Sequence, residues 1–286
     1  MTEKLFKGFL FILSLMSVFL LGFVILYIVM EALPLFKEVS LKDFLFSSKW
    51  APTGMTGNKS FGIFNFIMAS LFVSVYAMLI AVGFSLGCAI YLAFIAKSTL
   101  RSLLYAGIDL LAGIPSVIYG FIGMSVIVRS FAKLKVGTGH SVLSAALLLS
   151  IMLLPYMISS FTETLIKAKE RYLKSAEALG ISKWHTIVSL IIPSSAKFLL
   201  GSMLLAIGRA MGETMAVMML MGNANLFPKL LGKAESIASL IALEMGAAVG
   251  KSLHYYAAAL VLMLALLLIN MLIYFIRDKM IKSEVL

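Results

Sequence analysis

The chain is poor in charge and almost without cysteine. Charged residues make up 13% of its 286 residues, whereas hydrophobic residues make up 62%. A soluble domain carries about 25% charged residues, so this composition excludes an ordinary soluble globular protein. The single cysteine, Cys88, excludes an intrachain disulfide, and packing is its expected role in an apolar run. We therefore interpret the chain as a polytopic membrane protein, with nearly all of its length in the membrane domain.

Signatures of catalysis are also missing. The sequence has no glycine-rich loop with a lysine that would cradle a nucleotide phosphate, and no Cys/His spacing typical of zinc. It has no nucleophile–base constellation, so we predict no catalytic residue, no metal site and no enzyme activity. The formal net charge of +11 comes from basic residues scattered among short loops. This pattern argues against a nucleic-acid partner and favours charge flanking membrane spans.

Six apolar runs are present, and they predict an all-α protein with six transmembrane helices. A membrane-spanning helix needs about 20 apolar residues, and each run can supply them. The approximate ranges of the runs are 8–30, within 61–96, 102–128, 141–162, 198–228 and 253–276. An outer segment that begins at Ser236 also has apolar residues at helical spacing, which predicts a helix on or dipping into the membrane.

The number of crossings places both termini on one side of the membrane. Lysine and arginine are somewhat more frequent in the segments on that side, above all between the fourth and fifth runs and at the C-terminus. Because basic residues favour cytoplasmic loops, we expect both termini in the cytoplasm. The expected location is a bacterial-type plasma (inner) membrane.

Arg209 and Glu213 are the two charged residues inside the fifth run. A charge at membrane depth costs roughly 3 to more than 10 kcal/mol, so it normally faces a partner or a polar cavity. Residues four apart on a helix share one face and can pair. Two interpretations are open. The pair either fixes helix packing, or Arg209 lines a path for an anion while Glu213 positions the anion and partly neutralises the arginine when none is bound.

Four further polar residues are candidates for the same path. Thr214 and Asn223 can offer hydrogen bonds to an oxyanion or can satisfy helix backbone. Ser116 and Tyr119 follow Pro115, which frees backbone groups in the third run. These two residues either line the path or belong to a structural kink.

The segment at about 163–197, between the fourth and fifth runs, predicts two short helices joined at a glycine. Helix-forming residues continue to Leu179, and Gly180 offers a C-cap. Ser182 can cap the second helix, and Pro193 is expected to end or kink it. The predicted result is a compact knob on the inner surface; charge pattern alone fits a solvated amphipathic helix equally well.

The same segment resembles the EAA-type loop of ABC importer permeases. The spacing from Gly180 through nine residues to Leu190, and then to Ile192 and Pro193, is similar to the family pattern, whereas the family's glutamate falls on Lys174. Three other stretches resemble phosphate importer permeases: LLAGIPSVIYGFIG, GRAMGETMAVMMLMGN and IALEMGAAVGKSLHYYAAAL, starting at Leu110, Gly208 and Ile241. The Met-Ala-Val continuation of the second stretch is closer to the PstC type than to the PstA type. One departure is Phe94, which stands where an acidic residue is expected.

The resemblance implies a type I ABC importer permease fold. Residues 1–60 would then form an N-terminal transmembrane helix and outer loop, and residues 61–286 the permease core. The loop at 163–197 would dock on the ATPase subunits. The implied coupling residues are Ala176, Glu177, Gly180, Ile181, His185 and Pro193.

The implied function is that of the membrane subunit of an ATP-driven phosphate importer. Its implied partners are a second permease of the PstA type, a pair of ATPase subunits that bind the ATP, an extracytoplasmic phosphate-binding protein, phosphate and membrane lipid. This chain itself would bind no cofactor. Two alternatives remain, since charge alone does not choose the anion. They are an ABC permease for phosphonate, sulfate or molybdate, and a proton-coupled secondary anion carrier in which Glu213 or Asp109 would bind the proton.

Overall fold

A computed structural model of the chain describes residues 2–52, 59–135, 137–245 and 253–284. It is built almost entirely of helices, and six helical segments of this described part are long and apolar enough to cross a membrane. The all-α prediction with six spans is therefore confirmed. The chain divides into two compact units, Met1–Phe64 with Leu240–Leu264 and Asn65–Ser239 with Ala265–Leu286.

The first unit contains the N-terminal helix and a small outer subdomain. Its elements in chain order are α1 (Thr2–Ala32), the 3-10 turn η1 (Leu33–Lys37), α2 (Leu41–Phe46), β1 (Trp50–Ala51) and β2 (Ser60–Phe61). The two strands pair antiparallel with Trp50 opposite Phe61. The ring of Trp50 also packs against His254, with ring centroids 5.5 Å apart. The start of the last helix is thereby packed against the two-stranded sheet.

The second unit holds most of the membrane helices. Its elements begin with α3 (Phe64–Ile90), the π turn η2 (Tyr91–Ile95), α4 (Ser98–Gly113), α5 (Ser116–Gly123), the π turn η3 (Met124–Val128) and α6 (Arg129–Lys133). They continue with α7 (Val142–Ala178), α8 (Lys183–Thr186), the π turn η4 (Ile187–Ile191), α9 (Ile192–Met211) and α10 (Met215–Met221). The remaining helices, α11 (Ile237–Met245) and α12 (Leu253–Glu284), cross the division between the units.

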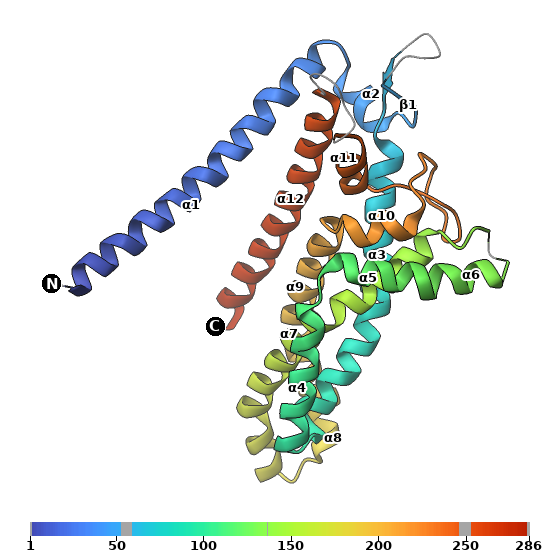
Figure 1. Cartoon of the computed structure of the whole chain (residues 1–286). Helices are drawn as coiled ribbons and strands as arrows, with labels where there is room; N and C mark the ends of the chain where they lie inside the picture. Colours follow the sequence, from blue (N-terminus) through green and yellow to red (C-terminus); the bar gives the residue numbers. More distant parts are fainter. Residues whose placement is uncertain (1, 53–58, 136, 246–252, 285–286) are drawn as a thin grey trace. The chain divides into compact units, whose positions relative to one another are not determined.

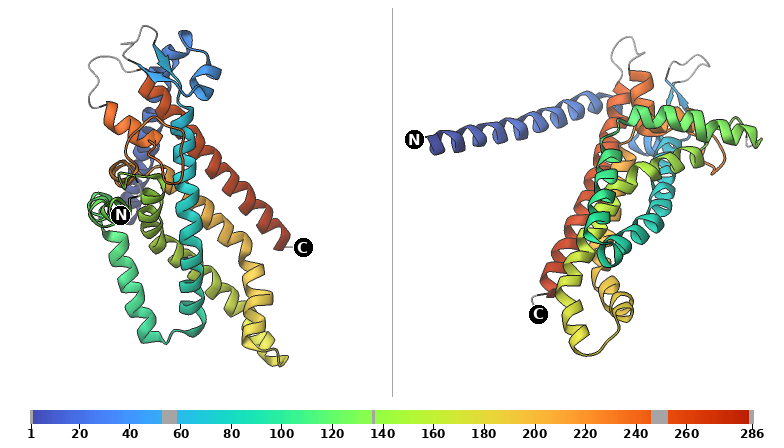
Figure 2. Two further views of the ribbon diagram at one scale, coloured as in Figure 1. Left: turned by 90° about the vertical axis from the view of Figure 1, so that its right-hand side faces the viewer. Right: turned by 60° about the horizontal axis from the view of Figure 1, so that its bottom comes forward.

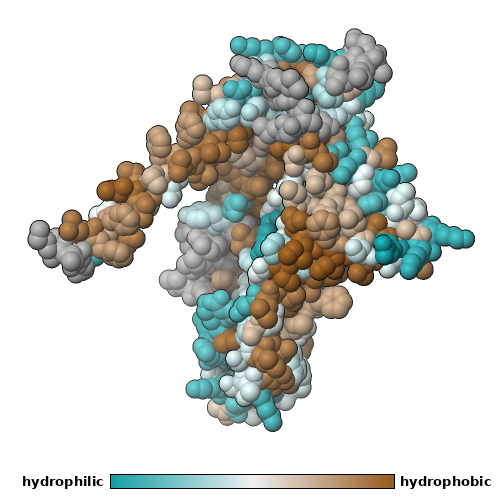
Figure 3. Space-filling view, in the orientation of Figure 1, coloured by the Kyte–Doolittle hydropathy of each residue, from teal (hydrophilic) through white to brown (hydrophobic). Residues whose placement is uncertain are grey.

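Two helical hairpins shape the second unit. Helices α3 and α4 run in opposite directions, as do α7 and α9, which are joined through α8 (Figure 2). The core is centred on α7, where Met157 and Phe161 are fully buried against small residues of α3 and α9 such as Ala77 and Ala206. Small residues allow membrane helices to approach closely, so this composition fixes the packing of α7. Hydrophobic side chains cover α1 and much of the visible flank of the second unit (Figure 3).

The predicted third span is not one helix. It is broken at Ile114 and Pro115, both of which have extended backbone angles, and the candidate span is Ser116–Lys133. Proline lacks an N–H and forces the residue before it out of the helical region, which explains the break. The prediction of a kink at this proline is therefore confirmed in a stronger form.

The fourth and fifth spans begin or end elsewhere than predicted. Helix α7 has 37 residues, roughly 55 Å at 1.5 Å per residue, and continues well past the predicted end near residue 162. The fifth candidate span is Lys183–Met211, whereas the prediction was 198–228. The predicted ranges followed the uncharged runs, so they left out the turns that carry polar and charged residues. A long helix can include such turns because its ends can extend beyond the apolar layer. The helix predicted from Ser236 is confirmed as α11; part of that segment, 246–252, lies outside the described residues.

Candidate functional site: a broken fifth helix and a coupling loop

Arg209 lies in the last turn of α9, with an exposed side chain. A cation at this end of a helix interacts favourably with the negative end of the helix dipole. Within the described part of the chain, no hydrogen bond or ion pair involves its guanidinium group. The arginine is thus held at the end of a candidate span by the helix, and its planar fork of donors remains available to an anion.

The predicted pairing of Arg209 with Glu213 on one helical face is wrong. Helix α9 ends at Met211, and Glu213 lies in a three-residue break before α10. The carboxylate oxygen Oε1 of Glu213 accepts a hydrogen bond from the backbone N–H of Ala216, with the two atoms 3.4 Å apart. Gly212 explains the break, since glycine is a poor helix former and the glutamate can cap the helix that follows. Glu213 therefore stabilises the start of α10.

Thr214 and Asn223 lie at opposite ends of α10. The Thr214 hydroxyl donates to the carbonyl oxygen of Gly212, 3.3 Å away, inside the break. Asn223 follows the helix with a positive φ of 45°, directly after Gly222 with φ 91°. A left-handed glycine commonly ends a helix, and asparagine tolerates the same region. Thr214 thus bonds to the main chain within the break, and Asn223 has a backbone conformation suited to the helix end. The two side chains lie at opposite ends of α10 and are not brought together.

Ser116 and Tyr119 belong to α5, which packs along α10. The Tyr119 hydroxyl donates to the Leu111 carbonyl oxygen of α4 at 2.9 Å and thereby bridges the break at the proline. A Cβ on Gly120 would meet Met219 and Ala216, and one on Gly123 would meet Leu220, so both helices run in the same direction. Figure 1 shows α5 and α10 side by side. Ser116 at the start of α5 is consequently placed at the same end as the break that holds Glu213 and Thr214.

The glycine junction predicted within residues 163–197 is confirmed, but the segments that it joins are not two separate short helices. They are the end of the 37-residue helix α7 and α8, which continues through η4 into α9. Gly180 has φ 70°, its N–H donates to the Glu177 carbonyl, and the next N–H, of Ile181, donates to the Ala176 carbonyl. These two hydrogen bonds form a Schellman motif, which requires the left-handed conformation that glycine adopts freely. Ser182 then caps α8 by accepting a hydrogen bond from the backbone N–H of His185 at 3.4 Å. The loop is locally fixed by these bonds.

Pro193 was expected to end or kink the second helix, and the structure contradicts the end. The chain stays helical from α8 through the π turn η4 into α9, and Pro193 is in the first turn of α9. A proline clashes with the carbonyl four residues before it, and a π turn widens the backbone at that point. The wider turn explains how the helix continues through Pro193.

Three cations that the sequence reasoning missed converge beside this loop. The Lys169 ammonium donates to the Ala93 carbonyl at 2.8 Å, and the Lys183 ammonium of α8 donates to the Phe94 carbonyl at 2.7 Å. Arg101 also reaches the Ala93 carbonyl, at 3.4 Å. These carbonyls form the end of the α3–η2 helix, where cations are favoured by the dipole. The sequence feature that could have pointed to this cluster of cations was Phe94, which stands where an acidic residue is expected.

Comparison with known proteins places this architecture. Residues 85–282 match the family described as the binding-protein-dependent transport system inner membrane component. This match covers more than half of the chain. The chain belongs to that family. The permease is accordingly a multi-pass inner membrane protein, and it is of the PstC type by the relatives that follow.

Several curated relatives of the permease carry the PstC name. The phosphate transport system permease protein PstC of Xylella fastidiosa (strain Temecula1) is 34% identical over 242 residues, covering 77% of this chain and 72% of the relative. The PstC of Mesorhizobium japonicum is 33% identical over 253 residues, covering 81% and 75%. The probable ABC transporter permease protein YqgH of Bacillus subtilis is 35% identical over 210 residues, covering 73% and 67%.

A solved structure confirms the fold of the permease. The MetNI methionine ABC transporter, in inward-facing conformations, matches with a TM-score of 0.55 over 76% of this chain and 94% of that chain. The sequence identity is 15%, so the match concerns the fold alone. The type I ABC importer permease fold expected from the sequence is thereby confirmed.

Proposed function

We propose that this permease is the PstC-type membrane subunit of an ATP-driven phosphate importer and that Arg209 binds phosphate along its path. The carrying observation is the Arg209 guanidinium, exposed at the end of a candidate span without a carboxylate within 4.0 Å in the described part of the chain. Arginine stays protonated and can grip two oxygens of a phosphate at once. The relatives named phosphate transport system permease support the choice of anion.

The broken helices beside Arg209 support an anion path. Irregular backbone at membrane depth is tolerated where it lines a cavity, and discontinuous helices are a recurring way to build ion sites in transporters. Helix α5 begins at Ser116 after a proline break, at the same end as the break between α9 and α10. Thr214 and Asn223, which make or adjoin backbone contacts, are the remaining proposed path residues, together with Tyr119.

The rest of the proposed assembly follows from the ABC importer family. ATP would be hydrolysed on a separate pair of subunits that dock at the α7–α8 loop, and this chain would carry no cofactor. A second permease of the PstA type and an extracytoplasmic phosphate-binding protein would complete the complex, with both termini of this chain in the cytoplasm. In this arrangement, ATP binding moves the α7–α8 loop, and the proposed phosphate path opens to the outer side of the membrane to receive phosphate.

The experiment is uptake of labelled phosphate into vesicles that contain the permease with its partner subunits and binding protein. We expect uptake that requires ATP on the ATPase side and that excess unlabelled phosphate abolishes, while sulfate and molybdate do not compete. ATP-dependent uptake of sulfate, molybdate or a phosphonate instead would retain the ABC mechanism and contradict the assignment of phosphate. Uptake that depends on the proton gradient at constant ATP would contradict an ATP-driven mechanism and favour the secondary carrier.

A further inference from the structure

A second polar space lies between α7 and α9, apart from the break at Arg209. It measures about 270 Å³ and is lined by Thr164, Lys167, Ala168, Arg171 and Tyr172 of α7 and by Ser194, Ser195 and Phe198 of α9. Liquid water occupies about 30 Å³ per molecule, so this space has room for a phosphate group. The lining contains two cations and four hydroxyl groups, and no carboxylate is among these described residues.

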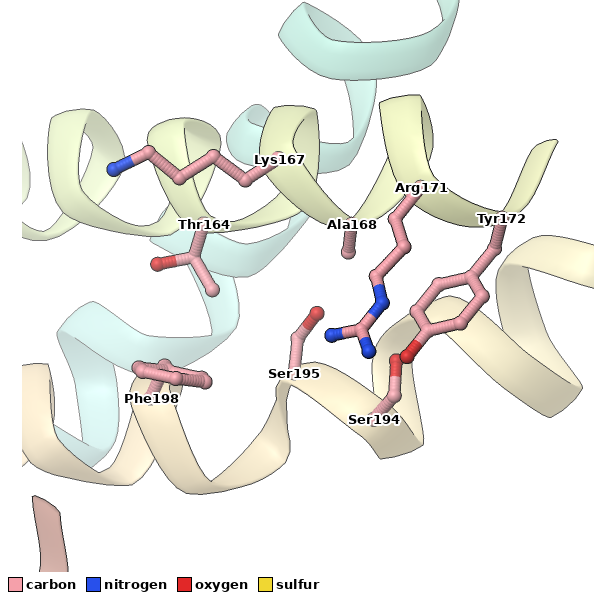
Figure 4. Close-up of a pocket in the computed structure, with 8 residues that line it drawn as sticks. All are labelled: Thr164, Lys167, Ala168, Arg171, Tyr172, Ser194, Ser195 and Phe198. Atoms are coloured by element: carbon pink, nitrogen blue, oxygen red, sulfur yellow. The ribbon is translucent and has the colours of Figure 1, made fainter. Parts of the chain in front are cut away.

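Arg171 is the cation that serves this space. Figure 4 shows its guanidinium extending from α7 toward Ser195 on α9. Its carbon Cζ stands 5.4 Å from the centroid of the Tyr172 ring, a cation–π contact that helps to fix its direction. Lys167 points away from Arg171 in the same view, and its ammonium lies 2.6 Å from the Glu163 carboxylate. The cation directed toward Ser195 is therefore the arginine.

Ser195 supplies the independent observation. The residue is 2% exposed, and among the residues that the structure describes its buried hydroxyl oxygen has no hydrogen-bond partner. A buried hydroxyl that makes no hydrogen bond is destabilising, so such groups normally have a partner. The neighbouring Ser194 hydroxyl donates to the Ile191 carbonyl at 3.0 Å and retains its acceptor capacity. Ser195 is thus a donor that lacks an acceptor, located beside an arginine that would attract an anion.

We propose that this space binds a phosphate group, held by the Arg171 fork and by the hydroxyl of Ser195, with Tyr172 at its rim. Arginine can hold two phosphate oxygens at once, and the Ser195 hydroxyl can donate to another oxygen from the facing helix. The group has two sources: the headgroup of an anionic phospholipid or a free phosphate ion. Phe198 at the other end of the space gives it an apolar side that suits the lipid. The site is separate from Arg209 and does not depend on which anion is transported.

The test uses the two permeases with their ATPase subunits in lipid nanodiscs, without the phosphate-binding protein, and with Arg209→Gln in every sample so that the proposed path contributes no binding. One arm counts phosphatidylglycerol retained on this chain by native mass spectrometry, using discs of phosphatidylcholine with phosphatidylglycerol. The other arm measures equilibrium binding of labelled inorganic phosphate in discs of phosphatidylcholine alone. We expect Arg171→Gln to reduce binding by about tenfold in one arm, because it removes a charged pair of hydrogen bonds. The arm that responds identifies the source.

Two further variants keep the result interpretable. Ser195→Ala removes only a hydroxyl, so it tests the site even where Arg171→Gln fails to assemble, and it is expected to weaken binding severalfold in the same arm. Lys167→Gln removes a neighbouring exposed cation that points away from Arg171, so binding should stay within about twofold. Binding unchanged by Arg171→Gln and Ser195→Ala in both arms would overturn the proposal. An equal loss in Lys167→Gln would do so as well, because it would reduce the effect to general surface charge.

Discussion

The loop between α7 and α8 and the end of α9, both predicted from the sequence to be functional, differ in the partners of their positively charged side chains. Beside the coupling loop, Lys169 and Lys183 donate to the main-chain carbonyls of Ala93 and Phe94. At the end of α9, Arg209 makes no such bond within the described residues. A cation with backbone partners stabilises the contact between two helices, whereas a cation held without them can bind an incoming anion. The partner of each charge, rather than its presence, therefore distinguishes the cations at the helix contact from the arginine proposed to bind the anion.

The largest effect is expected at Arg209. Replacing it with glutamine removes two charged hydrogen bonds to phosphate, together about 3 kcal/mol, so uptake should fall about 100-fold. Arg209→Lys keeps the charge but loses the fork, and a smaller loss is expected. Uptake of labelled phosphate at equal amounts of assembled complex is the measurement. Normal uptake by the glutamine variant would remove the arginine from the path.

A smaller effect is expected at Lys183, the residue that links α8 to the end of the α3–η2 helix. Lys183→Met removes a charged hydrogen bond, and a loss of about 1–2 kcal/mol corresponds to a factor of about 5 to 30. Because α8 would then move without α3, phosphate transported per ATP hydrolysed should fall while ATP hydrolysis persists. Lys174→Met, on the same loop, is the matched control and should keep the ratio. An equal fall in both variants would contradict the specific link.

Phe94→Glu tests whether the cations around η2 can accept the missing acidic residue. Phe94 is buried, and the Lys169 ammonium lies 5.7 Å from the centroid of its ring. A carboxylate there would be paired, so assembly and uptake should stay within about threefold of the parent. Leu92→Glu is the control, since Leu92 packs against the apolar Ala96 and Ile158. Burying an unpaired charge costs about 3–5 kcal/mol, so that variant should fail to assemble, as judged by size-exclusion chromatography. Equal failure of both variants to assemble would show that the cations around η2 do not accommodate a carboxylate at position 94.

Glu213 should give the smallest effect. Its carboxylate accepts a hydrogen bond from the Ala216 N–H, and glutamine can accept the same bond. Glu213→Gln should therefore change uptake by about twofold or less, whereas Glu213→Ala loses the cap and about 1 kcal/mol of stability. The measurements are phosphate uptake and thermal denaturation of the purified complex. A loss in the glutamine variant comparable with that of Arg209→Gln would restore a charge-pairing role.

Much of this fold was predictable from the sequence. Long apolar runs, Gly180 with a helix on either side, and Ser182 as a cap express local physics, and the structure has each of them. The end of α9 was not predictable in the same way. Glycine and glutamate near Arg209 are compatible both with a continuous helix and with a break, and the packing of α5 on α10 accompanies the break.

The partners of side chains were the least predictable part. Nothing local indicates that Lys169 and Lys183 reach the same helix end, because their acceptors lie far away in the sequence. The burial of the Ser195 hydroxyl was equally impossible to predict from nearby residues, since α7 and α9 come together only in the folded unit. Helix type and caps thus follow from nearby residues, whereas sites made by several helices follow from tertiary packing.

The most direct test of an anion path at Arg209 is the aqueous accessibility of position 209 in the assembled complex. Cys88 is exposed, so the measurement uses a Cys88→Ala background with Arg209→Cys and, as the control, Ala206→Cys, whose site is fully buried on the same helix. The complex is treated with a negatively charged, membrane-impermeant thiosulfonate. If Arg209 lies on an anion path, the cysteine at position 209 is modified at a rate that changes when ATP hydrolysis is trapped, and the cysteine at position 206 is not modified. Equal protection of both positions in every state would contradict an anion path at Arg209.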